Sequence, residues 1–550
     1  MRTPSTASPA VVLTTLNAKY IHASLGLRYL LANLGELRES TALREFTIAR
    51  PVGEIVDDLL STLDELNAAS GREGALQIVG FGVYIWNVVQ TTAVVRTLRA
   101  ARPHVRIVLG GPEVSHETDG QEIVALADHI ITGWGEASFP RLCRALIDGC
   151  RPPRIIAGEQ LPLTEIVLPY REYTDADLAH RLLYVEASRG CPFRCEFCLS
   201  ALDKTAWSFD LDRFLAEMQR LYERCARNFK FVDRTFNLKV DDSVRILHFF
   251  LDRLASSDDP ADRLFVHFEV IPDHLPERLR QLIAQFPAGS LQLEVGIQSF
   301  NEVVQQRISR RQDNARSEAN LRWLLECSQA HVHADLIFGL PGETLASFAE
   351  GFDRLYRLRP HEIQLGLLKR LRGTPIDRHT VEYGMVYDEL PPYTVQQTTA
   401  VDAPSVRRFT RFARYWEMIA NSGRFSRTLP LLLDENDDDR RVSSPFASFM
   451  DFSDWLWGRA QRTNGLSPER LVDALFDYLV ARGVPAERVR NALLTDYVAS
   501  GARGNPQALT GRLPKREMPV RREKARALRQ DQHLAGRLAE PVGLTDSAEV

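Results

Sequence analysis

Short apolar runs alternate with longer amphipathic stretches along the first 150 residues of the chain. Runs rich in β-branched and aromatic residues predict strands, whereas apolar positions three or four residues apart predict helices. The predicted strands are Val11–Thr15, Ile78–Tyr84, Ile107–Leu109 and His129–Thr132, and the predicted helices are Leu25–Leu34, Val52–Leu66, Asn87–Ala101 and Ala137–Ile147. This order predicts a doubly wound α/β domain with a parallel sheet over residues 1–150. Ligands of such sheets bind beyond the carboxyl ends of the strands.

A second series of β/α repeats follows a proline-rich linker at residues 151–180. Its predicted strands are Leu182–Ala187, Phe229–Val232, Leu264–Val270, Leu291–Gln298, Val332–Phe338 and Glu362–Leu368. The helical patterns between them are Leu211–Cys225, Ser243–Leu254, Pro276–Phe286, Ser317–Gln329 and Thr344–Leu358. These repeats predict a partial (β/α)6 barrel of the TIM type over residues 181–375, with its chemistry at the carboxyl ends of the strands.

The alternation stops after Pro375. Residues 376–500 are predicted to be a helical C-terminal accessory domain, with helices at Ser405–Ile419, Phe446–Arg459 and Pro468–Arg482. The last 50 residues contain 10 Lys and Arg against 6 Asp and Glu and have no sustained apolar period. We therefore expect residues 501–550 to be a disordered tail.

Composition narrows the class of protein. The 550 residues contain 68 Lys and Arg against 72 Asp and Glu, a formal charge of −4, and 44% are hydrophobic. These values, with a mean hydropathy of −0.21, are ordinary for a globular protein and give no reason to expect a nucleic-acid partner. No apolar run reaches the roughly 18–20 residues of a membrane-spanning helix, and the N-terminal segment lacks the apolar stretch of a secretory signal. Because cysteines are also sparse, we expect a cytoplasmic protein.

Three of the seven cysteines are concentrated in one short segment. Cys191, Cys195 and Cys198 have the spacing C-x3-C-x2-C and follow the first predicted barrel strand. Thiolates suit zinc or iron–sulfur clusters, but structural zinc sites usually have four protein ligands. A 4Fe-4S cluster on three cysteines instead leaves one iron open to another ligand. The other cysteines, at positions 143, 150, 225 and 327, lie in or beside helical patterns and are expected to be small buried side chains.

The cysteine segment, with Phe197 before its last cysteine, resembles the motif of the radical S-adenosylmethionine (SAM) superfamily. The resemblance implies that the three cysteines bind a 4Fe-4S cluster and that its open iron chelates SAM. It also implies that an electron from the cluster cleaves SAM to methionine and a 5′-deoxyadenosyl radical.

Later segments resemble the SAM-binding segments of this family, in the same order along the chain. They imply SAM contacts by Asp233, Glu269, Gly296, Gln298, Arg310 and Asp335. Glycine permits close backbone approach, glutamine offers a donor and an acceptor, and Arg310 is a natural partner for the SAM carboxylate, with Arg311 as the alternative. Taken singly, Glu269 and Asp335 are as readily explained as structural carboxylates.

The N-terminal domain, flavodoxin-like or Rossmann-like in its pattern, resembles that of the cobalamin-binding subgroup of this family. The resemblance implies cobalamin contacts by Asn17, Tyr20, Gly110, Gly111, Gly133, Gly135 and Glu136. The chain lacks the Asp-x-His-x-x-Gly motif whose histidine binds cobalt from below, so we expect cobalt without a protein histidine beneath it. The alternative is a domain that binds nothing, in which these glycines serve only tight turns.

The leading hypothesis is a cobalamin-dependent radical SAM enzyme, with C-methyl transfer as its reaction. It implies a 4Fe-4S cluster, SAM, cobalamin, an external electron donor such as flavodoxin or ferredoxin, and a small-molecule or macromolecular substrate. One alternative is a radical SAM enzyme without functional cobalamin that performs non-methylating radical chemistry. Another, from a different class, is a zinc-stabilised RNA-binding protein that uses the basic tail.

Overall fold

The chain forms two compact units. The computed structural model describes residues 9–69, 76–255, 263–434, 444–514 and 533. Unit 1 contains the residues up to 269 together with 369–378 and 387–394, and unit 2 contains 270–368, 379–386 and the residues from 395 onward. Two segments that follow the last predicted barrel strand therefore pack with the N-terminal half of the chain, which their local pattern did not predict.

The N-terminal part of unit 1 is a parallel sheet in the order β2-β1-β3-β4-β5-β6. Its strands are β1 (Ala10–Asn17), β2 (Thr41–Thr47), β3 (Gln77–Gly82), β4 (Arg106–Gly110), β5 (His129–Thr132) and β6 (Ile155–Ala157). The order 2-1-3-4-5 is that of flavodoxin-like folds, so the doubly wound prediction is confirmed. The sequence pattern missed β2 and β6 because both are edge strands, one interrupted by Arg44 and Glu45 and the other very short.

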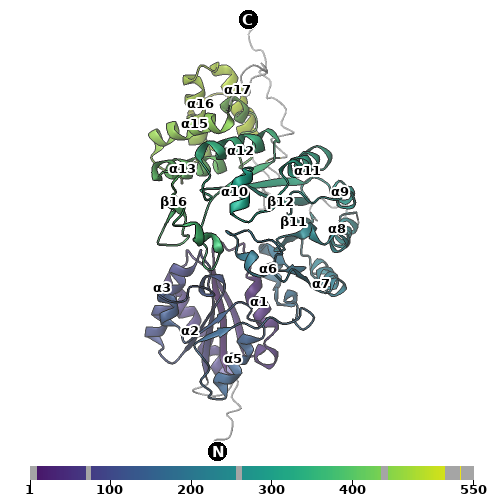
Figure 1. Ribbon diagram of the computed structural model, residues 1–550, viewed down its shortest axis with the longest axis vertical. Helices are drawn as coiled ribbons and strands as arrows, with labels where there is room; N and C mark the ends of the chain where they lie inside the picture. Colours follow the sequence, from purple (N-terminus) through teal and green to yellow (C-terminus); the bar gives the residue numbers. More distant parts are fainter. Residues whose placement is uncertain (1–8, 70–75, 256–262, 435–443, 515–532, 534–550) are drawn as a thin grey trace, which may run out of the picture. The chain divides into compact units, whose positions relative to one another are not determined.

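Helices cover both faces of this sheet (Figure 1). They are α1 (Leu25–Ala32), α2 (Val52–Ala69), α3 (Val88–Ala101), α4 (Glu122–Leu126) and α5 (Ser138–Ile147). One buried core joins α2, α3 and α4 to one face, and a second core joins α1 and α5 to the other. Val11 and Val12 of β1 belong to different cores, which explains why this strand is apolar on both sides.

The rest of unit 1 contributes three parallel strands that pair in the order β7 (Leu183–Val185), β10 (Asn228–Phe231) and β11 (Phe265–Val270). Helices α6 (Asp175–His180), α7 (Leu211–Glu223) and α8 (Val240–Ala255) accompany them. The two-residue strands β8 (Ser188–Arg189) and β9 (Trp207–Ser208) form a small antiparallel pair.

Unit 2 begins with three further parallel strands, β12 (Leu291–Gln298), β13 (His331–Phe338) and β14 (Glu362–Leu367). Its first helices are α9 (Glu277–Ile283), α10 (Glu302–Arg307), α11 (Asn314–Cys327) and α12 (Leu345–Arg357). All the strands predicted for the second domain are therefore present, and a helix follows most of them along the chain.

The C-terminal part of unit 2 is helical, as predicted. After the short strands β15 (Val386–Tyr387) and β16 (Val395–Gln397) come α13 (Ala403–Ile419), α14 (Leu429–Leu432), α15 (Pro445–Ala460), α16 (Pro468–Ala481) and α17 (Ala486–Ala499). The expected disordered tail is wrong for residues 501–514, because Leu509 is fully buried in a short helix that packs on α16 and α17. Except for His533, the remainder of that segment lies outside the described residues.

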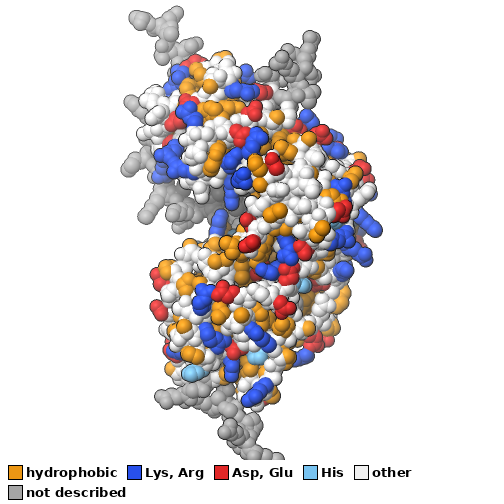
Figure 2. Space-filling view, turned by 60° about the vertical axis from the view of Figure 1, so that its left-hand side comes forward, with side chains coloured by type: hydrophobic (Ala, Val, Ile, Leu, Met, Phe, Trp, Pro, Cys, Tyr) orange, Lys and Arg blue, Asp and Glu red, His pale blue; other side chains and the backbone are white. Residues whose placement is uncertain are grey.

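The surface carries charges of both signs. Basic and acidic side chains are intermixed over the face displayed in Figure 2. Across the part of the chain that the structure describes, no helix combines the length and apolarity needed to cross a membrane.

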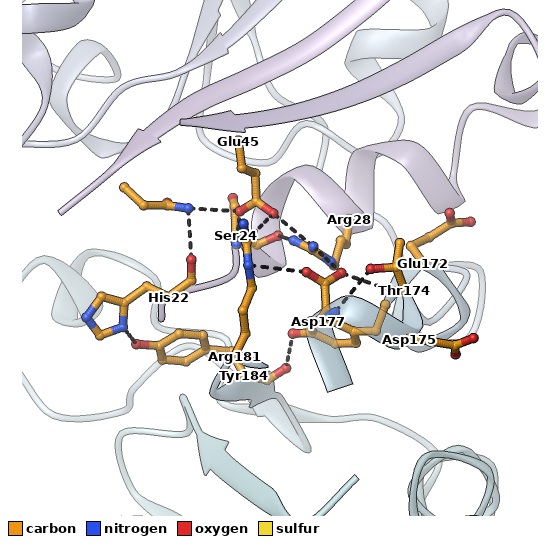
Figure 3. Close-up of polar contacts among 12 residues, drawn as sticks. His22, Ser24, Arg28, Glu45, Glu172, Thr174, Asp175, Asp177, Arg181 and Tyr184 are labelled. Carbon is orange, nitrogen blue, oxygen red and sulfur yellow. Dashed lines mark hydrogen bonds and ion pairs between the residues drawn. The ribbon is translucent and has the colours of Figure 1, made fainter. Parts of the chain in front are cut away.

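A buried cluster of charges, the charge clamp, fixes α1 and β2 to α6 and the residue after it within unit 1 (Figure 3). Arg28 lies 2.8 Å from both Glu45 and Asp177, and Arg181 lies 2.7 Å from Glu45 and 3.3 Å from Asp177. The four side chains are at most 9% exposed. Burial opposes the charge of Arg28, but Glu45 and its neighbours more than offset this effect and hold the pKa of the guanidinium above its ordinary value.

Candidate functional site

The three clustered cysteines lie on a loop that β8 and β9 close at its base. Gly190 adopts a φ of +86°, and a Cβ atom there would come within 2.9 Å of Asp203 O. A glycine is therefore required where the loop leaves β8. Cys191 N donates to Asp203 O at 2.8 Å, and Cys198 N donates to Cys195 O at 3.1 Å. These bonds fold the segment into a compact turn.

The three thiols lie within electrostatic range of one another. Cys191 is buried, and Cys195 and Cys198 are partly exposed. Burial, together with the two neighbouring thiols, raises the pKa of Cys191 to about 11. Three thiolates in such a place need a nearby positive charge, and a metal centre supplies it. The donor set therefore fits a cluster that is bound by three cysteines.

The prediction that the other four cysteines are buried is wrong for three of them. Cys143 is fully buried in the core between α5 and the sheet, as expected. Cys150, Cys225 and Cys327 are exposed instead. Cys327 is the last residue of α11, and Cys150 and Cys225 follow the carboxyl ends of α5 and α7.

A segment that follows β14 holds the middle of the cysteine loop. Glu196 is buried, its backbone oxygen accepts a hydrogen bond from Ile376 N at 3.0 Å, and its carboxylate pairs with Arg378. Arg372 of the same segment donates from Nε to Glu113 Oε1 at 2.9 Å, in the loop after β4. Within unit 1 this segment therefore links the flavodoxin-like sheet to the cysteine loop.

Two residues with an implied SAM role lie in unit 1. Asp233 accepts hydrogen bonds from Ala187 N at 3.0 Å and Ser188 Oγ at 2.6 Å, and burial raises the pKa of its carboxyl to about 7. It thereby positions the residues that lead into the cysteine loop. Glu269 forms a two-oxygen ion pair with Arg234, at 2.7 and 2.8 Å.

The other four implied SAM residues meet in unit 2. Gly296 is in register with Asp335 of the neighbouring strand, and the register then shifts between Gly296 and Gln298. Gln298 has a φ of +67°. Its side-chain nitrogen Nε2 would lie 2.6 Å from a Cβ atom at Gly296. Arg310 donates to Gly296 O and, at 2.9 Å, to Gln312. The β-bulge between Gly296 and Gln298 thus turns the Gln298 side chain toward Gly296, whose backbone oxygen accepts the hydrogen bond from Arg310.

Sequence reasoning did not select Glu343, which lies close to this group. It is 3% exposed, Ser299 Oγ donates to its Oε1, and its Oε2 has no hydrogen-bond partner among the described residues. Burial raises the pKa of Glu343 to about 7. The carboxyl therefore keeps its proton in the folded chain at a pH where an unfolded glutamate has lost it.

This raised pKa predicts a pH dependence of stability. As the pH rises from about 4.5 to about 7, the unfolded chain releases the proton of Glu343 first, so unfolding becomes easier. We expect this group to remove on the order of 3 kcal/mol over that window, and little more above it. In Glu343→Gln that contribution should vanish, as measured by urea unfolding at pH 5 and pH 8, whereas the exposed Glu302→Gln control should behave as the unmodified chain. An equal pH dependence in all three proteins would contradict the assignment.

A cavity of about 500 Å³ lies at the carboxyl ends of β3, β4 and β5 in unit 1. Apolar and aromatic side chains form most of its wall, and its volume is typical of cofactor sites. Five residues that the resemblance implies for cobalamin line it: Gly110, Gly111, Gly133, Gly135 and Glu136. The cavity therefore unites the glycine-rich loops that follow β4 and β5.

Arg189 is a residue of the cavity wall that sequence reasoning missed. It forms ion pairs with Glu136 at 2.6 Å and Glu186 at 2.9 Å, and its guanidinium lies 4.5 Å above the ring of Trp134. Both carboxylates and the indole also line the cavity. The sequence feature that could have identified Arg189 is its position two residues before Cys191.

Asn17 and Tyr20, which the resemblance implies for cobalamin, do not line this cavity. Asn17 donates to Glu45 Oε1 at 3.0 Å and to His22 O at 2.8 Å. Tyr20 is 55% exposed, and the guanidinium of Arg181 lies 4.6 Å from its ring. Both residues thus contact the charge clamp.

Models of known protein families match both the N-terminal sheet and the segment that contains the cysteine loop. Residues 11–143 match the model of the B12 binding domain, and residues 185–355 match the model of the radical SAM superfamily. The chain is a radical SAM protein with a B12-binding domain. Residues 381–547 match a third model, described as a protein of unknown function (DUF4080). The radical SAM match contains the three cysteines and all six implied SAM residues, which favours this interpretation over a zinc-stabilised RNA-binding protein.

Curated relatives of this radical SAM protein include two methyltransferases. The 2-(S-pantetheinyl)-carbapenam-3-carboxylate methyltransferase of Streptantibioticus cattleyicolor is 24% identical over 315 residues, 52% of this chain and 45% of that protein. The cobalamin-dependent radical SAM methyltransferase TokK of Streptomyces tokunonensis is 22% identical over 325 residues, 53% of this chain and 47% of that protein. The chain thus matches less than half the length of each.

A solved structure shares the fold. The radical SAM methyltransferase TsrM from Kitasatospora setae, solved with a tryptophan substrate and a SAM analogue, aligns with a TM-score of 0.53 and 17% identity. The alignment covers 70% of this chain and 79% of that one. At this identity the alignment shows that the two chains share a fold over the aligned residues.

The cavity of the B12-binding domain fits a large ligand that approaches the backbone. Gly133 has a φ of +73° and open space where a Cβ would lie, and Gly110 has only Ile131 O, 3.7 Å away. Gly111 differs, because a Cβ there would come within 2.5 Å of Val83 O, so the fold itself requires it. No histidine occurs among the described residues that line the cavity.

Proposed function

We propose that this chain is a cobalamin-dependent radical SAM enzyme that transfers a methyl group to a carbon atom of its substrate. The observation that carries the proposal is the position of Arg189, which lines the cavity of the B12-binding domain and precedes Cys191 by two residues. The proposed cobalamin cavity and the proposed cluster loop therefore share one structural element. Such proximity is what two cofactors that act on one substrate require.

The cofactors supply the reactive groups: SAM and the cluster a 5′-deoxyadenosyl radical, and cobalamin a methyl group. The chain binds and orients them. The three loop cysteines hold the cluster, while Gly296 and Gln298 accommodate the adenosyl part of SAM and Arg310 pairs with its carboxylate. Arg189, balanced by Glu136 and Glu186, keeps the wall between the two sites fixed.

The reaction needs an electron donor and a substrate carbon. We propose flavodoxin or ferredoxin as the external electron donor. We propose the cytoplasm as the compartment, because exposed free thiols are typical of a reducing environment. The methyltransferase names of the relatives support methyl transfer to a small-molecule or macromolecular substrate.

The test is corrinoid retention by the full-length protein. Anaerobically reconstituted protein, incubated with hydroxocobalamin and desalted, should retain about one corrinoid per chain by absorption spectroscopy and should form 5′-deoxyadenosine from SAM with dithionite. Gly133→Leu places a side chain in the open space of the cavity and should lower corrinoid affinity at least about tenfold, equivalent to about 1.4 kcal/mol. Its iron content should not change.

Gly149→Leu is the matched control. Gly149 also has a φ of +73° and open surroundings, but it does not line the cavity, so this variant carries the same backbone strain without filling the site. Equal corrinoid retention in both variants would contradict the assignment of the cavity. If the unmodified protein formed 5′-deoxyadenosine but retained no corrinoid, the alternative of a radical SAM enzyme without functional cobalamin would replace the proposal.

A further inference from the structure

A cluster of histidines and one carboxylate lies in unit 2. His331 is the first residue of β13 and Glu362 the first of β14, and His331 Nε2 lies 2.9 Å from Glu362 Oε1. Both are buried, at 5% and 3% exposure. The ring of His533 lies 5.1 Å from the ring of His331, and one donor atom from each of the three residues lies within 4.8 Å of the others.

This cluster is separate from the implied SAM residues of the same sheet. His331 and Glu362 begin their strands, whereas Gln298 ends β12 and Asp335 lies farther along β13. Because these strands are parallel, the cluster lies at the amino ends and the SAM residues lie toward the carboxyl ends. The function proposed above therefore does not use it.

The donor set has the chemistry of a zinc site. Two imidazoles and one carboxylate are a known ligand combination for Zn²⁺, with bonds of about 2.0–2.2 Å and a fourth position left for water. Tetrahedral ligands at such bond lengths lie roughly 3.3 Å from one another. A separation within 4.8 Å therefore needs only small side-chain rotations to close around an ion.

The surroundings of His533 orient its ring for binding. Its Nε2 lies 3.1 Å from Asn421 O, and because a carbonyl only accepts, this nitrogen carries the proton. In the neutral ring the lone pair is then on Nδ1, the arrangement seen when a metal-bound histidine donates its other N–H to a backbone oxygen. Asn421 is fixed by hydrogen bonds to both Ile363 N and Ile363 O, each at 3.0 Å.

A glycine makes room for this ring. Gly423 has a φ of +68°, and a Cβ there would lie 3.0 Å from His533 Cγ and Cδ2. A larger residue at position 423 would therefore crowd the ring of His533.

We propose that His331, Glu362 and His533 bind one Zn²⁺ ion, which anchors the chain at residue 533 to the amino ends of β13 and β14.

Zinc binding by the cluster-reconstituted full-length protein tests this proposal. Titration with ZnSO₄ against a chromophoric indicator should show one tight equivalent per chain, and X-ray absorption at the zinc edge should show nitrogen and oxygen neighbours without sulfur. His533→Gln and Glu362→Gln should each weaken that equivalent at least tenfold. His104→Gln, at an exposed histidine of unit 1, should bind zinc as the unmodified protein does.

The control and the readouts separate this site from the cofactor sites. His533 is only partly buried, so His533→Gln should remain folded and retain the iron and 5′-deoxyadenosine formation of the unmodified protein. Equal zinc affinity in His533→Gln and the unmodified protein, or a sulfur shell around the zinc, would overturn the proposal. Neither result depends on whether the chain binds cobalamin.

Discussion

Replacing Cys191, Cys195 and Cys198 together with alanine is expected to reduce the iron content of the reconstituted protein to background and to abolish 5′-deoxyadenosine formation. The three thiols form one group on a loop shaped by Gly190 and its backbone hydrogen bonds, so their loss removes the donor set as a whole. Iron is measured by plasma mass spectrometry, and 5′-deoxyadenosine by chromatography after anaerobic incubation with SAM and dithionite.

The chain provides a matched control for this experiment. Cys150, Cys225 and Cys327 are also free thiols, and all three are exposed and lie apart from the cysteine loop in the sequence. Replacing these three with alanine changes the number of cysteines equally and should leave iron content and 5′-deoxyadenosine formation unchanged. The assignment of the cluster ligands fails if both triple variants retain equal iron and equal product.

Arg28→Met is expected to produce the largest loss of stability. The substitution keeps much of the side-chain volume but leaves Glu45 and Asp177 buried with one cation fewer between them. Removing one partner from a buried ion pair typically costs about 3–5 kcal/mol. For a unit of this size, each kcal/mol lowers the midpoint of thermal unfolding by roughly 2–4 °C, so we expect a decrease of about 6–20 °C. Calorimetry and circular dichroism measure it.

Arg38→Met is the control for the charge clamp. Arg38 pairs with Glu172 at 2.7 Å, but its side chain is 45% exposed, so solvent screens the interaction. An exposed pair of this kind contributes about 0–1 kcal/mol, and the unfolding midpoint should move by no more than a few degrees. Similar shifts in both variants would show that the clamp contributes no more than a surface pair.

The strands that the sequence predicted well have either a mostly apolar run, as in β1, or a regular alternation of apolar and other residues, as in β12. The bounds predicted for β5 and β12 are the observed ones, and β1, which contributes to two cores, was recognised because both of its sides are apolar. The edge strands β2 and β6 were missed, since one is interrupted by charged residues and the other is only three residues long. Local apolar pattern reports burial, and edge strands are the least buried part of a sheet.

The candidate sites also fall into those that local sequence predicted and those that it missed. The cysteine loop was recognisable because its three donors lie within eight residues, so their spacing is visible in the sequence. Glu343, Arg189 and the histidine–carboxylate cluster were missed because their significance depends on partners far away in the chain. Glu343 meets Ser299 across 44 positions, and His331 meets Glu362 across 31.

The sequence by itself determined the parallel α/β architecture and the three-cysteine loop, since each rests on local periodicity or short spacing. Only the tertiary structure decided which glycines face an open cavity, that Arg189 belongs to the cavity wall, and that the segment after β14 returns to hold Glu196. The physical reason is that burial, desolvation and ion pairing depend on which distant segments meet, and those meetings are set by the packing of the whole unit.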